Sequence, residues 1–271
     1  MNCTTKKSKL NFILIISSSL VIIISLLWLN LSFLPKFLPK STAYKPKDFV
    51  ITHGDRNKKE VALTFDADLT PSMLKDLKSG KIKSWYNEKI IEILRKEKVQ
   101  ATIFMVGMWM EAYPEVAKSL AEDPLFELGN HSYSHPAFTP ACSNLTLIPD
   151  SKDEQEIVKT QKILKEITGT ENYLFRFPGG CHAKADEVIV HKLGLDIIDW
   201  DVASGDSFNP NTQEIINNVT QRTQNGSIVL FHLHDGPNAP KTAEALPTII
   251  KFLKDKGYSF VKVSEMIKSS N

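Results

Sequence analysis

From residue 50 onward, short apolar runs alternate with amphipathic stretches, and this alternation limits the available folds more than any other feature of the chain. Apolar runs predict strands at 60–65, 101–106, 125–128, 173–175, 196–199, 227–232 and 258–262. Helical periodicity lies between them, at 84–97, 114–122, 151–168, 184–193, 212–223 and 241–256. Strands that alternate with helices form a parallel sheet with crossover helices. We therefore predict an α/β fold, a distorted (β/α) barrel with about seven strands.

The N-terminal part of the chain has a different character. Residues 10–34 carry no charged side chain, and the run exceeds the length of about 20 residues that spans a bilayer. No small-residue cleavage site follows, so 10–34 predict one retained transmembrane signal-anchor helix. Lysines in the tail 1–9 favour a cytoplasmic N-terminus, although lysines also follow the span. Residues 35–57 then predict a spacer, and 58–268 a single domain outside the cytoplasm.

Charge and cysteine content exclude some functions. The chain has 33 basic and 31 acidic residues, a balance that gives no reason to expect a nucleic-acid partner. Three cysteines, Cys3, Cys142 and Cys181, are too few for a disulfide-built scaffold. Outside the cytoplasm, a Cys142–Cys181 bond and two free thiols are both compatible with the sequence.

Most residues that could carry chemistry lie at or directly after the end of an apolar run. They are Asp66, Asp68, His131, His135, Arg176, Asp201, Asp206, His232 and His234. In a β/α barrel the C-terminal strand ends converge on one face, where active sites are built. We therefore expect these side chains to meet in one pocket.

Two pairs of residues, one of histidines and one of aspartates, could together form a metal site and supply a general base. His131 and His135 are four residues apart, so on a helical turn they would share a face and could bind one divalent metal. A carboxylate from Asp66 or Asp68 could complete the ligand set, and the other could act as general base. Side-chain alternation along a strand puts both aspartates on one face without assigning their roles. Each pair alone is equally typical of turns or surface residues.

Three further segments could complete such a site. In R-F-P-G-G at 176–180, Arg176 could orient a carboxylate through a bidentate pair, and the glycines let backbone N–H groups approach a ligand. We expect Asp206 to be the partner of Arg176. His232 or His234 could be a general acid toward a leaving amine.

Five segments resemble the motifs of the polysaccharide deacetylase family, the NodB-homology group or carbohydrate esterase family 4, and they occur in the same order along the chain. They are T-F-D-A-D (64–68), H-S-Y-S-H (131–135), R-F-P-G-G (176–180), D-V-A-S-G-D (201–206) and L-F-H (230–232). The resemblance covers about residues 58–268. It implies one divalent ion, Zn²⁺ first with Co²⁺ or Ni²⁺ as alternatives. It also implies hydrolysis of N-acetyl groups on an extracellular polysaccharide, such as peptidoglycan, a chitin-like glycan or poly-N-acetylglucosamine, which releases acetate and leaves a free amine.

The resemblance assigns the metal site by position, with one departure. Asp66 matches the catalytic base, and His131 and His135 match the metal ligands. The family's metal-binding aspartate directly follows the base, but here that position is Ala67. We expect a local shift that lets Asp68 ligate the metal. The reverse assignment, with Asp66 as ligand and Asp68 as base, stays open.

The resemblance also assigns the groups around the reaction centre. Arg176 matches the arginine that orients the base, with Asp206 behind it. The backbone N–H of Gly179 falls where the oxyanion donor is expected. His232 matches the general acid, with His234 as the alternative.

A second departure is the long stretch 69–100, with LKSGKIKSWY inserted, which predicts a surface insertion, with a lid or a partner surface as alternatives. Two other functions stay open. The Ala67 departure motivates a non-catalytic glycan-binding or regulatory protein on the same fold. The other is a hydrolase of a different acyl or amide substrate.

Overall fold

The structure, a computed structural model, describes residues 50–140, 142 and 145–268. The predicted tail, the transmembrane segment 10–34 and residues 35–49 of the predicted spacer lie outside these residues. None of the helices in the described ranges has both the length and the apolar character needed to cross a bilayer.

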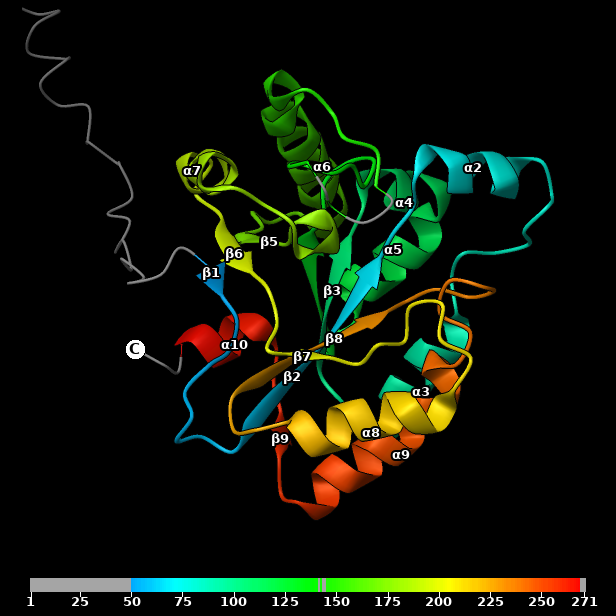
Figure 1. Cartoon of the computed structure of the whole chain (residues 1–271), viewed down its shortest axis with the longest axis vertical. Helices are drawn as coiled ribbons and strands as arrows, with labels where there is room; N and C mark the ends of the chain where they lie inside the picture. The colour runs from blue at the N-terminus through cyan, green and yellow to red at the C-terminus, as the bar shows by residue number, and fades with distance from the viewer. Residues whose placement is uncertain (1–49, 141, 143–144, 269–271) are drawn as a thin grey trace, which may run out of the picture. The chain divides into compact units, whose positions relative to one another are not determined.

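One sheet, in which every ladder is parallel, forms the centre of the domain (Figure 1). Its strands are β1 (Val50–Ile51), β2 (Glu60–Ala67), β3 (Ala101–Met105), β4 (Phe126–Asn130), β5 (Leu174–Phe175), β6 (Asp196–Ile198), β7 (Val202–Ala203), β8 (Ser227–His232) and β9 (Ser259–Phe260). The order is β1-β6-β5-β4-β3-β2-β8-β7, with β9 beside β2. In the described part of the chain no ladder joins β1 to β7, so the barrel is open. The predicted parallel strands are confirmed, and the short β1 and β7 are additional.

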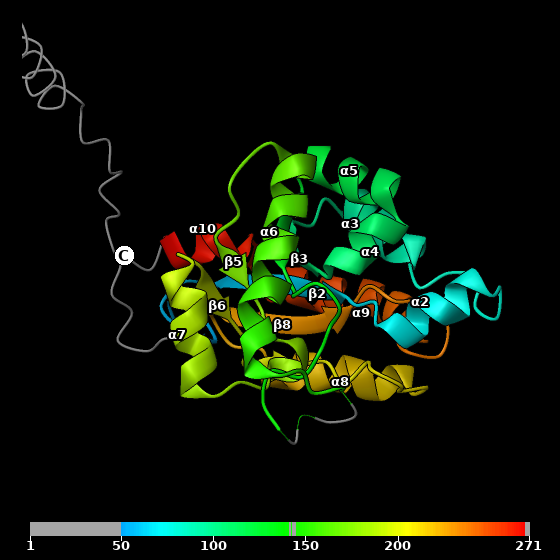
Figure 2. The ribbon, with the colours of Figure 1, turned by 90° about the horizontal axis from the view of Figure 1, so that it is seen from above.

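The helices lie outside the sheet (Figure 1 and Figure 2). They are α2 (Pro71–Lys78), α3 (Glu88–Glu97), α4 (Gly107–Ala112), α5 (Pro114–Glu122), α6 (Asp153–Thr168), α7 (Lys184–Lys192), α8 (Thr212–Arg222), α9 (Thr242–Asp255) and α10 (Val263–Lys268). The six predicted helices are confirmed. The first begins only at Glu88, so residues 84–87 belong to the loop that follows α2.

Local patterning explains why these elements form. Every residue of β2 from Val61 to Ala67 is buried, as expected for a parallel strand covered on both faces. Helix α3 buries Ile90, Ile91 and Leu94, which lie on one side at helical spacing. Each such apolar side chain stabilises the fold by about 1.5–3 kcal/mol when fully buried.

The strand register aligns the C-terminal ends. Ala67 pairs with Met105, Met105 pairs with Asn130, and Asn130 pairs with Phe175. On the other side of β2, Asp66 pairs with His232. The segments that follow these strands therefore start at the same edge of the sheet, as predicted.

Asp201 is an exception to that rule. Its carboxylate accepts hydrogen bonds from the backbone N–H of Ile228 (2.9 Å) and from Ser227 Oγ (2.9 Å), and it pairs with Arg56 (2.7 Å). Ser227 and Ile228 begin β8, whereas His232 ends it. Asp201 therefore lies at the opposite end of the sheet, and our expectation that it joins the other residues is wrong.

Candidate active site

The histidine segment is not the helical turn that we expected. Ser132 and His135 both have positive φ, 64° and 57°, which no helix allows. Asn130 Oδ1 accepts from the Ser132 N–H (2.9 Å), and Ser132 Oγ accepts from the His135 N–H (3.2 Å). These bonds stabilise a compact bend in which the centroids of the His131 and His135 rings lie 5.0 Å apart. Such left-handed residues are uncommon and tend to occur at functional sites.

Asp68 and the two histidines form a buried cluster with the composition of a metal site. Asp68 Oδ1 lies 3.3 Å from His131 Nε2 and 3.4 Å from His135 Nε2. His131 Nδ1 donates to the Arg176 carbonyl (2.8 Å), which directs Nε2 toward the carboxylates. Asp68 Oδ1 and His131 Nε2 are buried and have no hydrogen-bond partner among the described residues. Buried polar atoms without partners are rare, and a divalent cation would satisfy these two.

The electrostatics of the cluster agree with that fit. Burial alone would raise the pKa of Asp68, but His135, His131 and His234 hold it well below its usual range. Burial lowers the pKa of His135 to about 4, so its ring is neutral at pH 7 and can ligate. Burial would also lower the pKa of His131, but Asp66 and Asp68 raise it overall. The two carboxylates therefore favour a positive charge at this position, which a proton or a metal ion would supply.

Asp66 is held by Arg176, as the resemblance implies. Arg176 is fully buried, and its Nη1 donates to Asp66 Oδ1 (2.7 Å) and to Thr64 Oγ1 (2.9 Å). Its guanidinium lies over the Phe104 ring, 4.1 Å from the centroid. The expected bidentate pair is wrong, because only one guanidinium nitrogen reaches Asp66. The other carboxylate oxygen, Oδ2, is 3.4 Å from His131 Nε2.

Asp206 does not pair with Arg176, which corrects our prediction. Its carboxylate accepts from the His232 N–H (2.9 Å), from His232 Nδ1 (2.8 Å) and from Thr242 Oγ1 (2.7 Å). The reason is topological: Asp206 follows β7, and β7 pairs with β8, which ends at His232. Burial alone would lower the pKa of His232, but Asp206 raises it to about 10.

The two candidates for the general acid have different environments. The side chain of His232 is 17% exposed, and its Nε2 lies 4.0 Å from Asp68 Oδ2. His234 is only 2% exposed, and its Nε2 lies 3.1 Å from the same oxygen. His234 Nδ1 is 3.3 Å from the carbonyl oxygen of Trp85. Sequence reasoning missed Trp85 and Thr242, because neither belongs to a motif or follows a strand.

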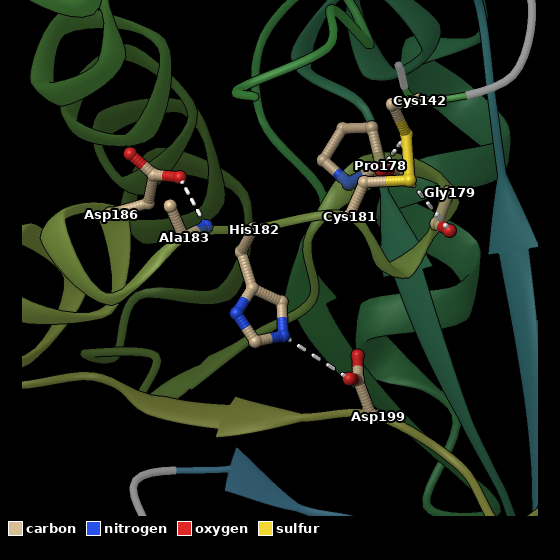
Figure 3. The surroundings of a disulfide bond; sticks show 8 residues. All are labelled: Cys142, Pro178, Gly179, Cys181, His182, Ala183, Asp186 and Asp199. Carbon is tan, nitrogen blue, oxygen red and sulfur yellow. Dashed lines mark hydrogen bonds and ion pairs between the residues drawn. A yellow bond between two sulfur atoms is a disulfide. The ribbon is translucent and has the colours of Figure 1, made fainter. Parts of the chain in front are cut away.

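A disulfide holds the turn that contains Gly179. Cys142 and Cys181 are bonded, which decides the alternative that the sequence left open. Figure 3 shows the bond beside Pro178 and Gly179. Gly179 has a φ of 65°, and a Cβ at this position would lie 2.9 Å from Cys142 Sγ. The turn therefore requires glycine for its conformation and for the close approach of the disulfide.

Comparisons with known proteins agree with this geometry. Residues 53–198 match the model of the family described as "Polysaccharide deacetylase". A peptidoglycan-N-acetylglucosamine deacetylase from Bacillus cereus is 31% identical, over 80% of this chain and 71% of its own length.

Two solved structures are also similar. One is the peptidoglycan N-acetylglucosamine deacetylase Bc1960, with 28% identity, a TM-score of 0.70, and coverage of 82% of this chain and 94% of its own. The other is a carbohydrate esterase family 4 pseudoenzyme from Bacillus anthracis, with 28% identity, a TM-score of 0.65, and coverage of 80% and 68%. This chain therefore belongs to the polysaccharide deacetylase family, carbohydrate esterase family 4, and is a hydrolase of that family.

Proposed function

We propose that the protein removes N-acetyl groups from peptidoglycan in a metal-dependent reaction, releases acetate and leaves a free amine on the glycan. The observation that carries this proposal is the cluster at the sheet edge. It combines three metal-ligand side chains with an arginine-bound carboxylate and a carboxylate-bound imidazole. The Bacillus cereus relative, named for its action on peptidoglycan, supports the choice of substrate.

The residues in this cluster suit defined steps of amide hydrolysis. Asp66 takes a proton from the attacking water, and Arg176 keeps its carboxylate aligned. The Gly179 N–H, on an exposed turn, donates to the oxygen of the acetyl group as negative charge develops there. His232, protonated through its contact with Asp206, then donates a proton from Nε2 to the departing amine.

Asp68, His131 and His135 would hold the metal ion, and we propose Zn²⁺, with Co²⁺ or Ni²⁺ as alternatives. When bound, the ion supplies Lewis-acid chemistry at the acetyl carbonyl. We propose His232 as the general acid in place of His234, because His232 is the more exposed of the two and its Nδ1 is bound by a carboxylate.

We also propose that residues 10–34 hold the protein in a membrane, with the catalytic domain outside the cytoplasm. The uncharged segment supports the span, and the Cys142–Cys181 disulfide supports an oxidising compartment. Extraction of membranes with alkaline carbonate tests the span. Release of the protein into the soluble fraction would contradict it.

Acetate release tests the activity directly. The purified protein, loaded with Zn²⁺ or Co²⁺, should release acetate from peptidoglycan and more slowly from chitin or poly-N-acetylglucosamine oligomers. The absence of acetate from all three glycans, with metal bound, would contradict the proposal.

Two matched variants separate the roles of the aspartates. Asp68→Asn should lose bound metal, because its Oδ1 faces both histidines. Asp66→Asn should keep the metal and lose activity by at least about 10²-fold, the scale of general base catalysis. Metal content of the two purified variants is the measurement, and the opposite pattern would reverse the assignment.

A non-catalytic role is the alternative, because the similar Bacillus anthracis structure is described as a pseudoenzyme and this chain has Ala67 where the resemblance places the metal-binding aspartate. A protein of this kind would bind peptidoglycan without releasing acetate. The binding and acetate assays therefore distinguish the two functions.

A further inference from the structure

His234 contacts both places where this chain departs from the family motifs. One is Asp68, which follows Ala67, and the other is the long segment after Asp68, which contains Trp85. The His234 side chain is 2% exposed and lies between Trp85 and Asp68. Its Nδ1 is 3.3 Å from the Trp85 carbonyl oxygen, and its Nε2 is 3.1 Å from Asp68 Oδ2. The reaction proposed above does not use His234.

The inserted segment holds the Trp85 carbonyl in place through several contacts. Trp85 is 4% exposed, and its indole Nε1 donates to the Met73 carbonyl in α2 (2.9 Å). Its backbone N–H donates to Tyr113 Oη (2.8 Å). Its ring packs edge-on against the His234 ring, with centroids 6.4 Å apart and an interplanar angle of 85°. His234 is therefore oriented by a residue that belongs to the insertion.

The two oxygens of Asp68 have separate neighbours. Oδ1 faces His131 and His135, whereas Oδ2 faces His234 at 3.1 Å and, at 4.0 Å, His232. Asp68 lies one residue beyond the end of β2, so no ladder bond of that strand holds its backbone. A carboxylate at such a position needs another contact to fix its rotamer, and bonds from outside the ligand set commonly supply that orientation.

We propose that His234 is the positioning residue for Asp68, and that the inserted segment 69–87 contributes to the site by fixing His234 through Trp85. This inference rests on the proposed function, because it takes Asp68 as a metal ligand. The segment after Asp68 thereby compensates for the one-residue shift that Ala67 introduces. The inserted segment therefore supports the active site as well as forming a surface insertion.

A pair of substitutions at His234 separates hydrogen bonding from packing. His234→Gln keeps an N–H donor near the position of Nε2, whereas His234→Met keeps a similar volume without the donor. We expect His234→Met to weaken Co²⁺ binding by about 10–100-fold, the usual effect of removing such a contact. His234→Gln should recover most of that loss. Titration of the purified protein with Co²⁺, without substrate, measures both, and circular dichroism verifies the fold.

Two further variants test the insertion and the specificity of the effect. Trp85→Ala should weaken Co²⁺ binding in the same direction, because it removes the ring and the indole donor that hold the loop. His182→Gln is the matched control. His182 is also a largely buried imidazole near two carboxylates, Glu187 (3.2 Å) and Asp199 (3.5 Å). In the described part of the chain the imidazoles beside Asp68 are those of His131, His135, His232 and His234. The Co²⁺ affinity of the His182→Gln variant should equal that of the wild-type protein.

Each outcome decides the inference. Wild-type Co²⁺ affinity in His234→Met would overturn it, as would a His234→Gln variant no better than His234→Met, which would indicate packing alone. A changed Co²⁺ absorption spectrum in His234→Met would make His234 a ligand and overturn its positioning role. Unchanged binding in Trp85→Ala would overturn the role of the insertion. If the wild-type protein bound no Co²⁺, the metal-dependent function itself would fail, and the inference with it.

Discussion

The contact between Asp206 and His232 predicts a specific change in the pH dependence of the reaction. Asp206→Asn is nearly isosteric and removes the negative charge that accepts from His232 Nδ1 and from the His232 N–H. The pKa of His232 is raised to about 10 in the folded protein, with Asp206 as the main cause that opposes burial. Without that carboxylate, burial is opposed only by the weaker effects of Asp68 and Asp66, so the pKa of His232 should fall toward its ordinary value of about 6.5.

The size of the effect follows from the fraction of His232 that is protonated. At pH 8.5 a group with a pKa of about 10 is almost fully protonated, whereas one with a pKa of about 6.5 is about 1% protonated. Loss of the proton donor should therefore lower kcat/KM at pH 8.5 by about 100-fold, within the usual range for general acid catalysis. At pH 6 the same variant should be much closer to the wild-type protein, because both rings carry a proton.

Acetate release from peptidoglycan between pH 6 and pH 10 measures this difference. The alkaline limb of the profile should move to lower pH by several units in Asp206→Asn. Thr242→Val is the control, because it removes one hydrogen bond to Asp206 (2.7 Å) and keeps the charge. An unmoved alkaline limb in Asp206→Asn, or an equal shift in Thr242→Val, would refute the reasoning.

Two other predictions concern stability. The Cys142–Cys181 bond closes a loop with a sequence separation of 39, so its reduction should lower the free energy of unfolding by about 4 kcal/mol in the chain-entropy model. A Cys142→Ala/Cys181→Ala variant should melt at the same temperature with and without dithiothreitol. A wild-type melting temperature that does not change when dithiothreitol is added would contradict this prediction. Asp153 is fully buried with two carboxylate oxygens that have no partner among the described residues, and burial and Asp186 raise its pKa to about 7. Because the folded pKa lies above the unfolded one, the stability from this group is complete below about pH 4 and is lost as the pH rises to about 7. Asp153→Asn should remove this dependence, which is worth about 2–3 kcal/mol between pH 5 and pH 8 for these pKa values and is measured by urea unfolding at both pH values. A free energy of unfolding that changes with pH by the same amount in the variant and the wild type would contradict the assignment.

Much of the fold could be predicted because it depends on local patterns. Runs such as VALTF become buried parallel strands, and the spacing of Ile90, Ile91 and Leu94 places them on one face of α3. The convergence of Asp66 and His131 also follows from general topology, since parallel strands end at one edge. The short strands β1 and β7 were missed because β1 lies in the segment assigned to the spacer and β7 lies in the segment treated as a site motif, D-V-A-S-G-D.

Contacts between side chains from different strand ends could not be predicted in the same way. Asp206 was expected to bind Arg176, but β7 pairs with β8 and places it beside His232. The pairing order of short strands depends on the packing of the whole sheet. The sequence near residue 206 alone therefore does not predict which strand β7 pairs with.

The sequence alone determined the α/β class, the family motifs and the residue types that could hold a metal, because periodicity and motif spacing are properties of short segments. Only the tertiary structure decided that Asp68 faces both histidines, that His135 adopts a left-handed conformation and that Trp85 reaches His234. These contacts join residues up to 149 positions apart, and they depend on how loops pack at the sheet edge.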